Sequence, residues 1–280
     1  MSSQDETRTT ADEVVAELRA SPDPRGPTKW ETWGLRPIVL FAAAYTIIGI
    51  LHEWAHALTA YALKVPTTLF HLNVHLDRAD GTLNERAVIR IAGPLFCLIV
   101  GLVCWIAYKK AKGSRAALPL LYLAWFGIGT LLGNLMSTPF VGDFSDLALA
   151  FHLTMPVRYG AGIIGLLLLC GLSFLIGMEL RKWAPEGISG VKAMIGVIAL
   201  PVTFGTVLVI LIYLPMSLGL AVSRMAESSF WIFGAVGALI SRKHLAESSR
   251  KLGLGWVDFA VLLAAVFVVR LMVGGIAFTP

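Results

Sequence analysis

Apolar stretches long enough to cross a lipid bilayer dominate this 280-residue chain. A transmembrane helix needs about 20 predominantly apolar residues, and such runs lie near residues 37–62, 87–108, 117–138, 159–180, 193–215 and 254–277. A weaker run near 217–240 carries charges and is expected to lie in the interface or to be partly re-entrant. Hydrophobic residues make up 56% of the chain and charged residues 15%, which excludes an ordinary soluble domain. We therefore predict an all-α polytopic membrane protein with about 6–7 transmembrane helices.

The remaining composition narrows the functional classes. The net charge is +5, but no cluster of Lys and Arg alternates with aromatic residues as in a nucleic-acid-binding surface, so no nucleic-acid partner is expected. The three cysteines, Cys97, Cys104 and Cys170, lie in apolar runs and are predicted to be small core residues. No secretory signal peptide is predicted at the polar N-terminus.

The chain divides into three parts. Residues 1–36 form a polar, largely disordered leader with a short helix over Ala11–Ala20. Residues 37–150 form a core of three helices that holds all the candidate site residues. Residues 151–280 supply further transmembrane helices, expected to be scaffold or gate, and Pro201 is expected to kink one of them.

Residues 64–86 are predicted to form a small β-hairpin after the first span. Polar and apolar residues alternate from Phe70 to Leu76, as in a half-buried strand, and Asp77–Gly81 has the composition of a turn. The second arm is expected near Thr82–Arg86. We also expect the hairpin to lean on the helices, because an isolated hairpin is marginally stable in water.

The stretch His52-Glu53-Trp54-Ala55-His56 carries the chemistry of the first span. Charged and ionisable side chains are costly at bilayer depth and usually functional there. Residues four apart share a helix face, so His52 and His56 can present two imidazoles to one zinc ion. Glu53 lies beside them and is predicted to take a proton from a water bound to that zinc, so that the resulting hydroxide attacks a peptide carbonyl.

A catalytic zinc site usually has three protein ligands. The third is expected after the third span, where Pro139 and Gly142 interrupt the helix. Asp143 is the favoured ligand and would open the next helix as its N-cap, and Asp146, one turn later, is the rival. Since this segment and the distal half of the first span lie on the same side of the membrane, the ligands can meet.

Other ionisable residues have simpler interpretations. His71 and His75 would share a strand face, so a second metal site is conceivable, although solvated strand positions are favoured. His152 is a candidate partner of the Asp pair. Glu179 is either a metal ligand of another kind or, preferably, a member of an interfacial ion pair with Arg181 or Lys182.

The region 38–150 resembles the site-2 protease family of intramembrane zinc metalloproteases. The likeness rests on His52-Glu53-Trp54-Ala55-His56, on the hairpin-like segment, on Ile91-Ala92-Gly93-Pro94-Leu95-Phe96, and on the Asn134…Pro139…Gly142-Asp143 element. Phe144 stands where that family has a glycine after the Asp. The resemblance implies a transmembrane protein as substrate, cut within the bilayer, with the plasma membrane as the expected location.

Two other functions fit parts of the same pattern. A metal or solute transporter could use the His/Glu cluster as a binding site, but internal repeats and paired broken helices, which are common in transporters, are not detected. A catalytically inactive scaffold would be expected to have lost Glu53 or one of the histidines, and all three are present.

Overall fold

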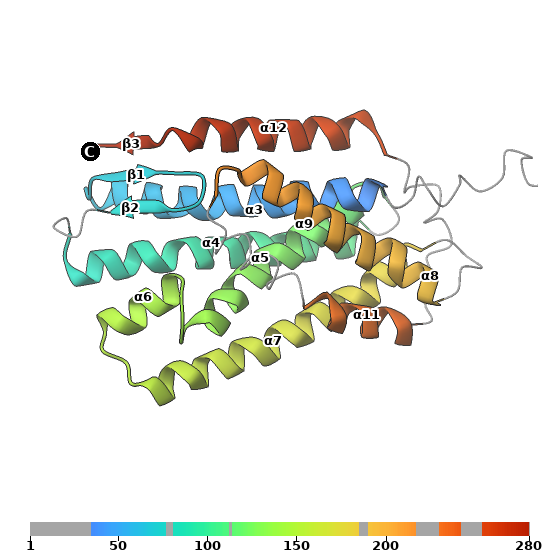
Figure 1. Ribbon diagram of the computed structural model, residues 1–280, viewed down its shortest axis with the longest axis horizontal. Coiled ribbons are helices and arrows are strands. Elements are labelled where there is room, and N and C mark those ends of the chain that lie inside the picture. The colour runs from blue at the N-terminus through green and yellow to red at the C-terminus, as the bar shows by residue number, and fades with distance from the viewer. Residues whose placement is uncertain are drawn as a thin grey trace, which may run out of the picture.

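The structure is a computed structural model that describes residues 35–76, 81–111, 114–184, 190–216, 230–241 and 254–279 (Figure 1). Its architecture is a bundle of long helices with one small sheet, which confirms the predicted all-α polytopic fold. The predicted leader helix over Ala11–Ala20 lies outside the described residues.

Within the described part of the chain, 6 helices are long and apolar enough to cross a membrane. They are α3 (Leu35–Ala62), α4 (Leu83–Lys110), α5 (Ala117–Ser137), α7 (Met155–Arg181), the segment Ile195–Tyr213, and α12 (Trp256–Val273). Large apolar side chains such as Val103 and Leu167 stay exposed on the bundle surface, as expected of helices that face lipid.

Helix α3 is the centre of the bundle and packs against α4, α5, α9 (Leu200–Tyr213) and α12. Its inner face carries Phe41, whose ring meets those of Tyr122 and Trp125 edge-on, with centroids 6.1 Å away in each case. Side chains on α3 are therefore held by neighbouring helices on most sides.

Helix α3 begins earlier than predicted, because Leu35 and Arg36 belong to it and not to the leader. Arg36 is almost fully buried, and its Nε lies 3.0 Å from Asp258 Oδ2 at the start of α12. Its guanidinium also donates to the carbonyl of Arg115 at 2.9 Å. This pairing lets a cationic residue enter a buried helix end, since a buried charge is tolerated when it is paired.

Three later segments refine the predictions. Over the described part of 217–240, α11 (Trp231–Ile240) has 10 residues, too few to span a bilayer. The predicted irregularity near Pro201 takes the form of a π-helical turn, η1 (Ile195–Ala199), between α8 (Gly190–Met194) and α9. The last helix ends at Val273, ahead of two consecutive glycines, and not at 277.

The sheet has three strands in the order β2-β1-β3, and both pairings are antiparallel. A hairpin after the first span is present, but its arms are β1 (Thr67–Leu69) and β2 (Val74–Leu76), with the turn at 70–73. The third strand, β3 (Ile276–Phe278), comes from the C-terminal region. It packs against α3, where the Phe278 and Trp54 ring centroids lie 5.7 Å apart.

The predicted second arm near Thr82–Arg86 is wrong, because these residues start helix α4. Thr82 is the N-cap: its hydroxyl accepts from the Glu85 amide at 3.3 Å, and the Glu85 carboxylate accepts from the Thr82 amide at 2.6 Å. This capping box satisfies two otherwise unpaired amides and fixes the helix start. Arg86, expected at the end of the second arm, therefore lies within α4, as does Arg90.

Candidate metal centre

His52 and His56 lie one turn apart on α3 and face the same side, as their spacing predicts. Their Nε2 atoms are 3.1 Å apart and their ring planes are perpendicular. His56 is buried and His52 is partly buried. Both rings lie against α4, where Gly93 leaves room for them.

The orientation of the His56 ring is fixed by a backbone carbonyl of α4. Its Nδ1 lies 2.6 Å from the Ile89 oxygen. Because a carbonyl oxygen can only accept, Nδ1 carries the hydrogen and Nε2 presents a lone pair. This is the usual way in which a metal-binding imidazole is oriented.

The turn between α5 and α6 (Asp143–Ala150) places Asp143 opposite the two histidines. Gly142 has φ 98°, a conformation that other residues rarely adopt, and the chain thereby reverses into α6. The Asn134 side-chain oxygen accepts from the Asp143 amide at 3.2 Å. Gly142, not Asp143 as predicted, is the N-cap of α6, and Asp143 is its first residue.

The three side chains converge on one point. Asp143 Oδ2 lies 3.1 Å from His52 Nε2 and 3.4 Å from His56 Nε2. A tetrahedral ion with bonds of about 2.0–2.2 Å, as in zinc sites, separates its ligand atoms by about 3.3–3.6 Å. A lone pair of His56 and a carboxylate oxygen would repel each other at this distance unless a cation or a proton lay between them. His52, His56 and Asp143 could therefore hold a metal ion.

Arg90 separates the roles of the two candidate aspartates. Its guanidinium lies 3.3 Å from Asp143 Oδ1 and 3.1 Å from Asp146 Oδ2. The Asp146 side chain is 51% exposed, whereas that of Asp143 is 10% exposed and directs its other oxygen at the histidines. Asp143 is thus the aspartate that joins the histidines, and Asp146 is an ion-pair partner of Arg90.

The environment keeps Asp143 ionised. Burial by itself opposes the charged form. When protons lie between Asp143 and the two histidines, hydrogen bonds from His52 and His56 and the positive charge of their rings outweigh burial and hold the pKa of Asp143 well below its usual range. A bound cation would take the place of these protons. An anionic carboxylate is the form that ligates a divalent cation.

Arg158 anchors the turn that carries Asp143. This residue of α7 is buried, and its guanidinium donates to the Pro139 carbonyl at 2.8 Å, to the Thr138 carbonyl at 3.4 Å and to Ser145 Oγ at 3.3 Å. The turn before α6 and the first turn of α6 are thus tied to a transmembrane helix. A ligand on such a support loses little conformational freedom when it binds an ion.

Cys97 lies behind the His52 ring. Its Sγ is 3.8 Å from His52 Nδ1 and 3.6 Å from the Ile48 carbonyl oxygen. With the thiol hydrogen directed at Ile48, the sulfur lone pairs face the ring, which suits a hydrogen on Nδ1 and a free lone pair on Nε2.

Glu53 stands on the same part of α3 as His56, three residues along the helix. It is half-buried, and its charge acts on both His56 and Cys97. Helical spacing places Glu53 on a part of α3 adjacent to His56, where the sequence predicted a proton acceptor.

The other three histidines that the structure describes do not join this cluster. His71 and His75 share no strand face: His71 lies in the hairpin turn, buried, with Nε2 3.1 Å from the Tyr213 carbonyl oxygen, and His75 is exposed on β2. His152 is exposed after α6. Glu179 is in an ion pair, as favoured, but with Lys109 as well as Lys182.

Three residues of the site were not singled out from the sequence: Arg90, Cys97 and Arg158. Arg90 lies in the predicted second span, but its contacts with Asp143 and Asp146 depend on how α4 and α6 pack. Cys97 and Arg158 reach the site only through contacts between helices, and no local pattern marks them.

Gly93→Ala is expected to lower the metal affinity by about 10- to 100-fold, the range found when outer partners of metal ligands are lost. A Cβ at this position would lie 2.4 Å from His56 Nε2 and 2.9 Å from His52 Cε1, so the rings must move. The measurement is a zinc titration of the purified protein. Gly133→Ala on α5 is the matched control, because nothing lies within 4 Å of its added Cβ. Equal zinc affinity of the two variants would contradict the ring placement described above.

Comparison of the chain with models of protein families, with curated proteins and with solved structures found no match.

Proposed function

We propose that this multi-pass membrane protein is an intramembrane zinc metalloprotease, of the kind that the site-2 protease family represents, and that it acts in the plasma membrane. The observation that carries the proposal is the convergence of Asp143 with His52 and His56 next to Glu53. Two imidazoles and one carboxylate, with water as the fourth ligand, are the donor set of many catalytic zinc sites in hydrolases.

Zinc bound by these three residues would polarise a peptide carbonyl and make water a stronger acid. Glu53 is the residue that accepts the proton from the attacking water and passes it to the leaving amine. Asp143 and the histidines hold their positions through Arg158, Asn134 and the Ile89 carbonyl. The reaction breaks one peptide bond and consumes one water, so no further cofactor is needed.

The sheet offers a means of holding the substrate. Strand β1 is paired on both sides, whereas β2 is an outer strand of the described sheet. Leu76 at the end of β2 packs near Ile89, whose carbonyl contacts His56. We propose that an unwound transmembrane segment pairs with the free edge of β2, since such an edge can bind a peptide through its backbone.

Removal of the metal tests this function. Protein reconstituted with a transmembrane reporter peptide is expected to cleave it, to lose cleavage after treatment with a zinc chelator, and to regain it when zinc is restored. The reason is that the chelator competes with the three protein ligands for the zinc ion and removes it from the site. Cleavage products are identified by mass spectrometry.

Magnesium added in place of zinc is the control, because a site with two imidazoles favours zinc over a cation that prefers oxygen ligands. Chelator-resistant cleavage would overturn the proposal. Zinc binding with no cleavage would favour the alternatives, a metal transporter or an inactive scaffold.

A further inference from the structure

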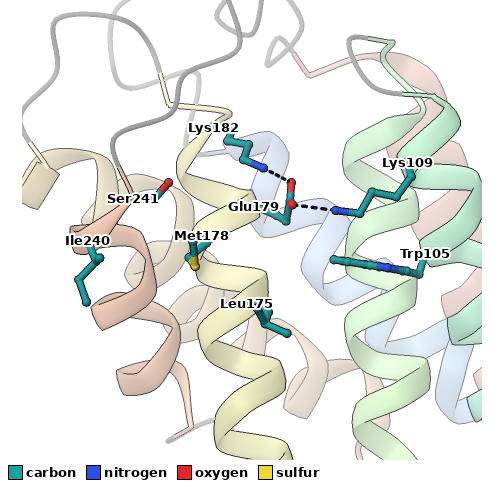
Figure 2. A pocket seen from close by; sticks show the side chains of 8 residues that line it. All are labelled: Trp105, Lys109, Leu175, Met178, Glu179, Lys182, Ile240 and Ser241. Carbon is teal, nitrogen blue, oxygen red and sulfur yellow. Dashed lines mark hydrogen bonds and ion pairs between the residues drawn. The ribbon is translucent and has the colours of Figure 1, made fainter.

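A cavity lies at the C-terminal end of α4, whereas the metal centre lies against the N-terminal half of that helix. Figure 2 shows the side chains that line the cavity. It has a volume of about 590 Å³ and is formed by the C-terminal turns of α4, α7 and α11. Its lining residues are Trp105, Lys109, Leu175, Met178, Glu179, Lys182, Ile240 and Ser241.

Two ammonium groups in this cavity share a single carboxylate. Lys109 Nζ lies 2.8 Å from one oxygen of Glu179, and Lys182 Nζ lies 2.7 Å from the other (Figure 2). Tyr108 also donates to Glu179, at 2.7 Å. The carboxylate is thus saturated while the lysines keep donors to spare, because each ammonium has three hydrogens. One positive charge is left in excess.

The rest of the lining suits a lipid better than a soluble anion. The Trp105 ring lies under Lys109, with Nζ 4.2 Å from its centroid, as is common where a membrane helix meets the headgroup region. Leu175 and Ile240 are 53% and 61% exposed, so an apolar surface leads from the cavity along the outside of α7 and α11. The basic groups at the helix ends are therefore followed by an apolar surface, as the charged headgroup of a phospholipid is followed by its acyl chains.

We propose that this cavity binds an anionic phospholipid, with the headgroup phosphate on Lys109 and Lys182 and the acyl chains along Leu175 and Ile240. Basic pockets between transmembrane helices are known to take such headgroups. The site joins α4, which carries Arg90 and Gly93, to α7, which carries Arg158, but the proposal does not depend on protease activity.

The test is a lipid titration followed by native mass spectrometry of the detergent-solubilised full chain, with phosphatidylglycerol and phosphatidylcholine as separate probes. Phosphatidylglycerol is expected to bind more tightly. Lys109→Gln and Lys182→Gln are each expected to weaken its binding about fivefold, the effect of one basic residue near a membrane surface. Lys110→Gln, the same charge change on the neighbouring exposed residue, is the matched control and is expected to leave binding unchanged.

Glu179→Gln provides the complementary variant. It removes the competing carboxylate but keeps an oxygen that accepts from Tyr108, so phosphatidylglycerol is expected to bind more tightly to it. Equal binding of the two lipids, equal loss in Lys110→Gln and Lys109→Gln, or weaker binding by Glu179→Gln would overturn the proposal. Displacement of the lipid by inorganic phosphate would also overturn it, since a lipid is held by its chains as well.

Discussion

Glu53→Gln is expected to lower peptide cleavage by about 10²- to 10⁴-fold, the range typical of a lost general base. Gln has the same size but cannot accept a proton from water, whereas the three metal ligands remain in place. Zinc content is therefore expected to stay unchanged. Both quantities are measured on one preparation, by reporter cleavage and by elemental analysis.

Glu85→Gln is the matched control for this substitution. This substitution makes the same chemical change as Glu53→Gln, but in the capping box of α4. Because Gln can also complete a capping box, full activity is expected. Undiminished cleavage by Glu53→Gln would eliminate the proposed role of Glu53. Loss of zinc in the same variant would instead make Glu53 part of the metal site.

Asp143→Ala removes a metal ligand itself. It is expected to lower zinc affinity by more than about 100-fold, the upper end of the loss caused by removing a residue that only hydrogen-bonds a ligand. In that variant Arg90 keeps only the Asp146 carboxylate, and no negative charge lies between its guanidinium and the metal position. Asp146→Ala keeps the Asp143 contact of Arg90 and is expected to retain zinc. Zinc titration and thermal unfolding of the two variants separate metal loss from unfolding.

The two aspartates offer a direct comparison, since they lie three residues apart and contact the same arginine. Zinc loss in Asp146→Ala with retention in Asp143→Ala would contradict the ligand assignment. Equal loss in both variants would show that Arg90 and its two partners act as one unit in holding the metal.

Much of the candidate site could be predicted from the sequence because its strongest signal is local. His52 and His56 are four residues apart on one helix, so helical geometry alone puts them on one face. Asp143 was a weaker prediction, since it depends on how α5 turns back at Gly142 and on how α6 packs against α4 and α5. The comparison with Asp146 was decided by Arg90, which lies on a different helix from either aspartate.

The helices followed from composition, and their ends were less certain. Arg36 was placed in the leader because the first span was predicted to begin at residue 37. Its burial depends on Asp258, which lies 222 positions away in the sequence. Ile276 and Ala277 of β3 continued an apolar run and were included in the predicted last span, 254–277. Their pairing with β1 is set by backbone hydrogen bonding between segments at opposite ends of the chain.

The sequence by itself determined that the chain crosses a membrane and that one span carries a metal-binding face, because hydropathy and helical spacing act over neighbouring residues. Tertiary structure alone decided which carboxylate completes that face, which arginines hold it, and where β3 joins the sheet. These features depend on contacts between residues tens to hundreds of positions apart, whose approach is set by how whole helices pack and not by any local pattern.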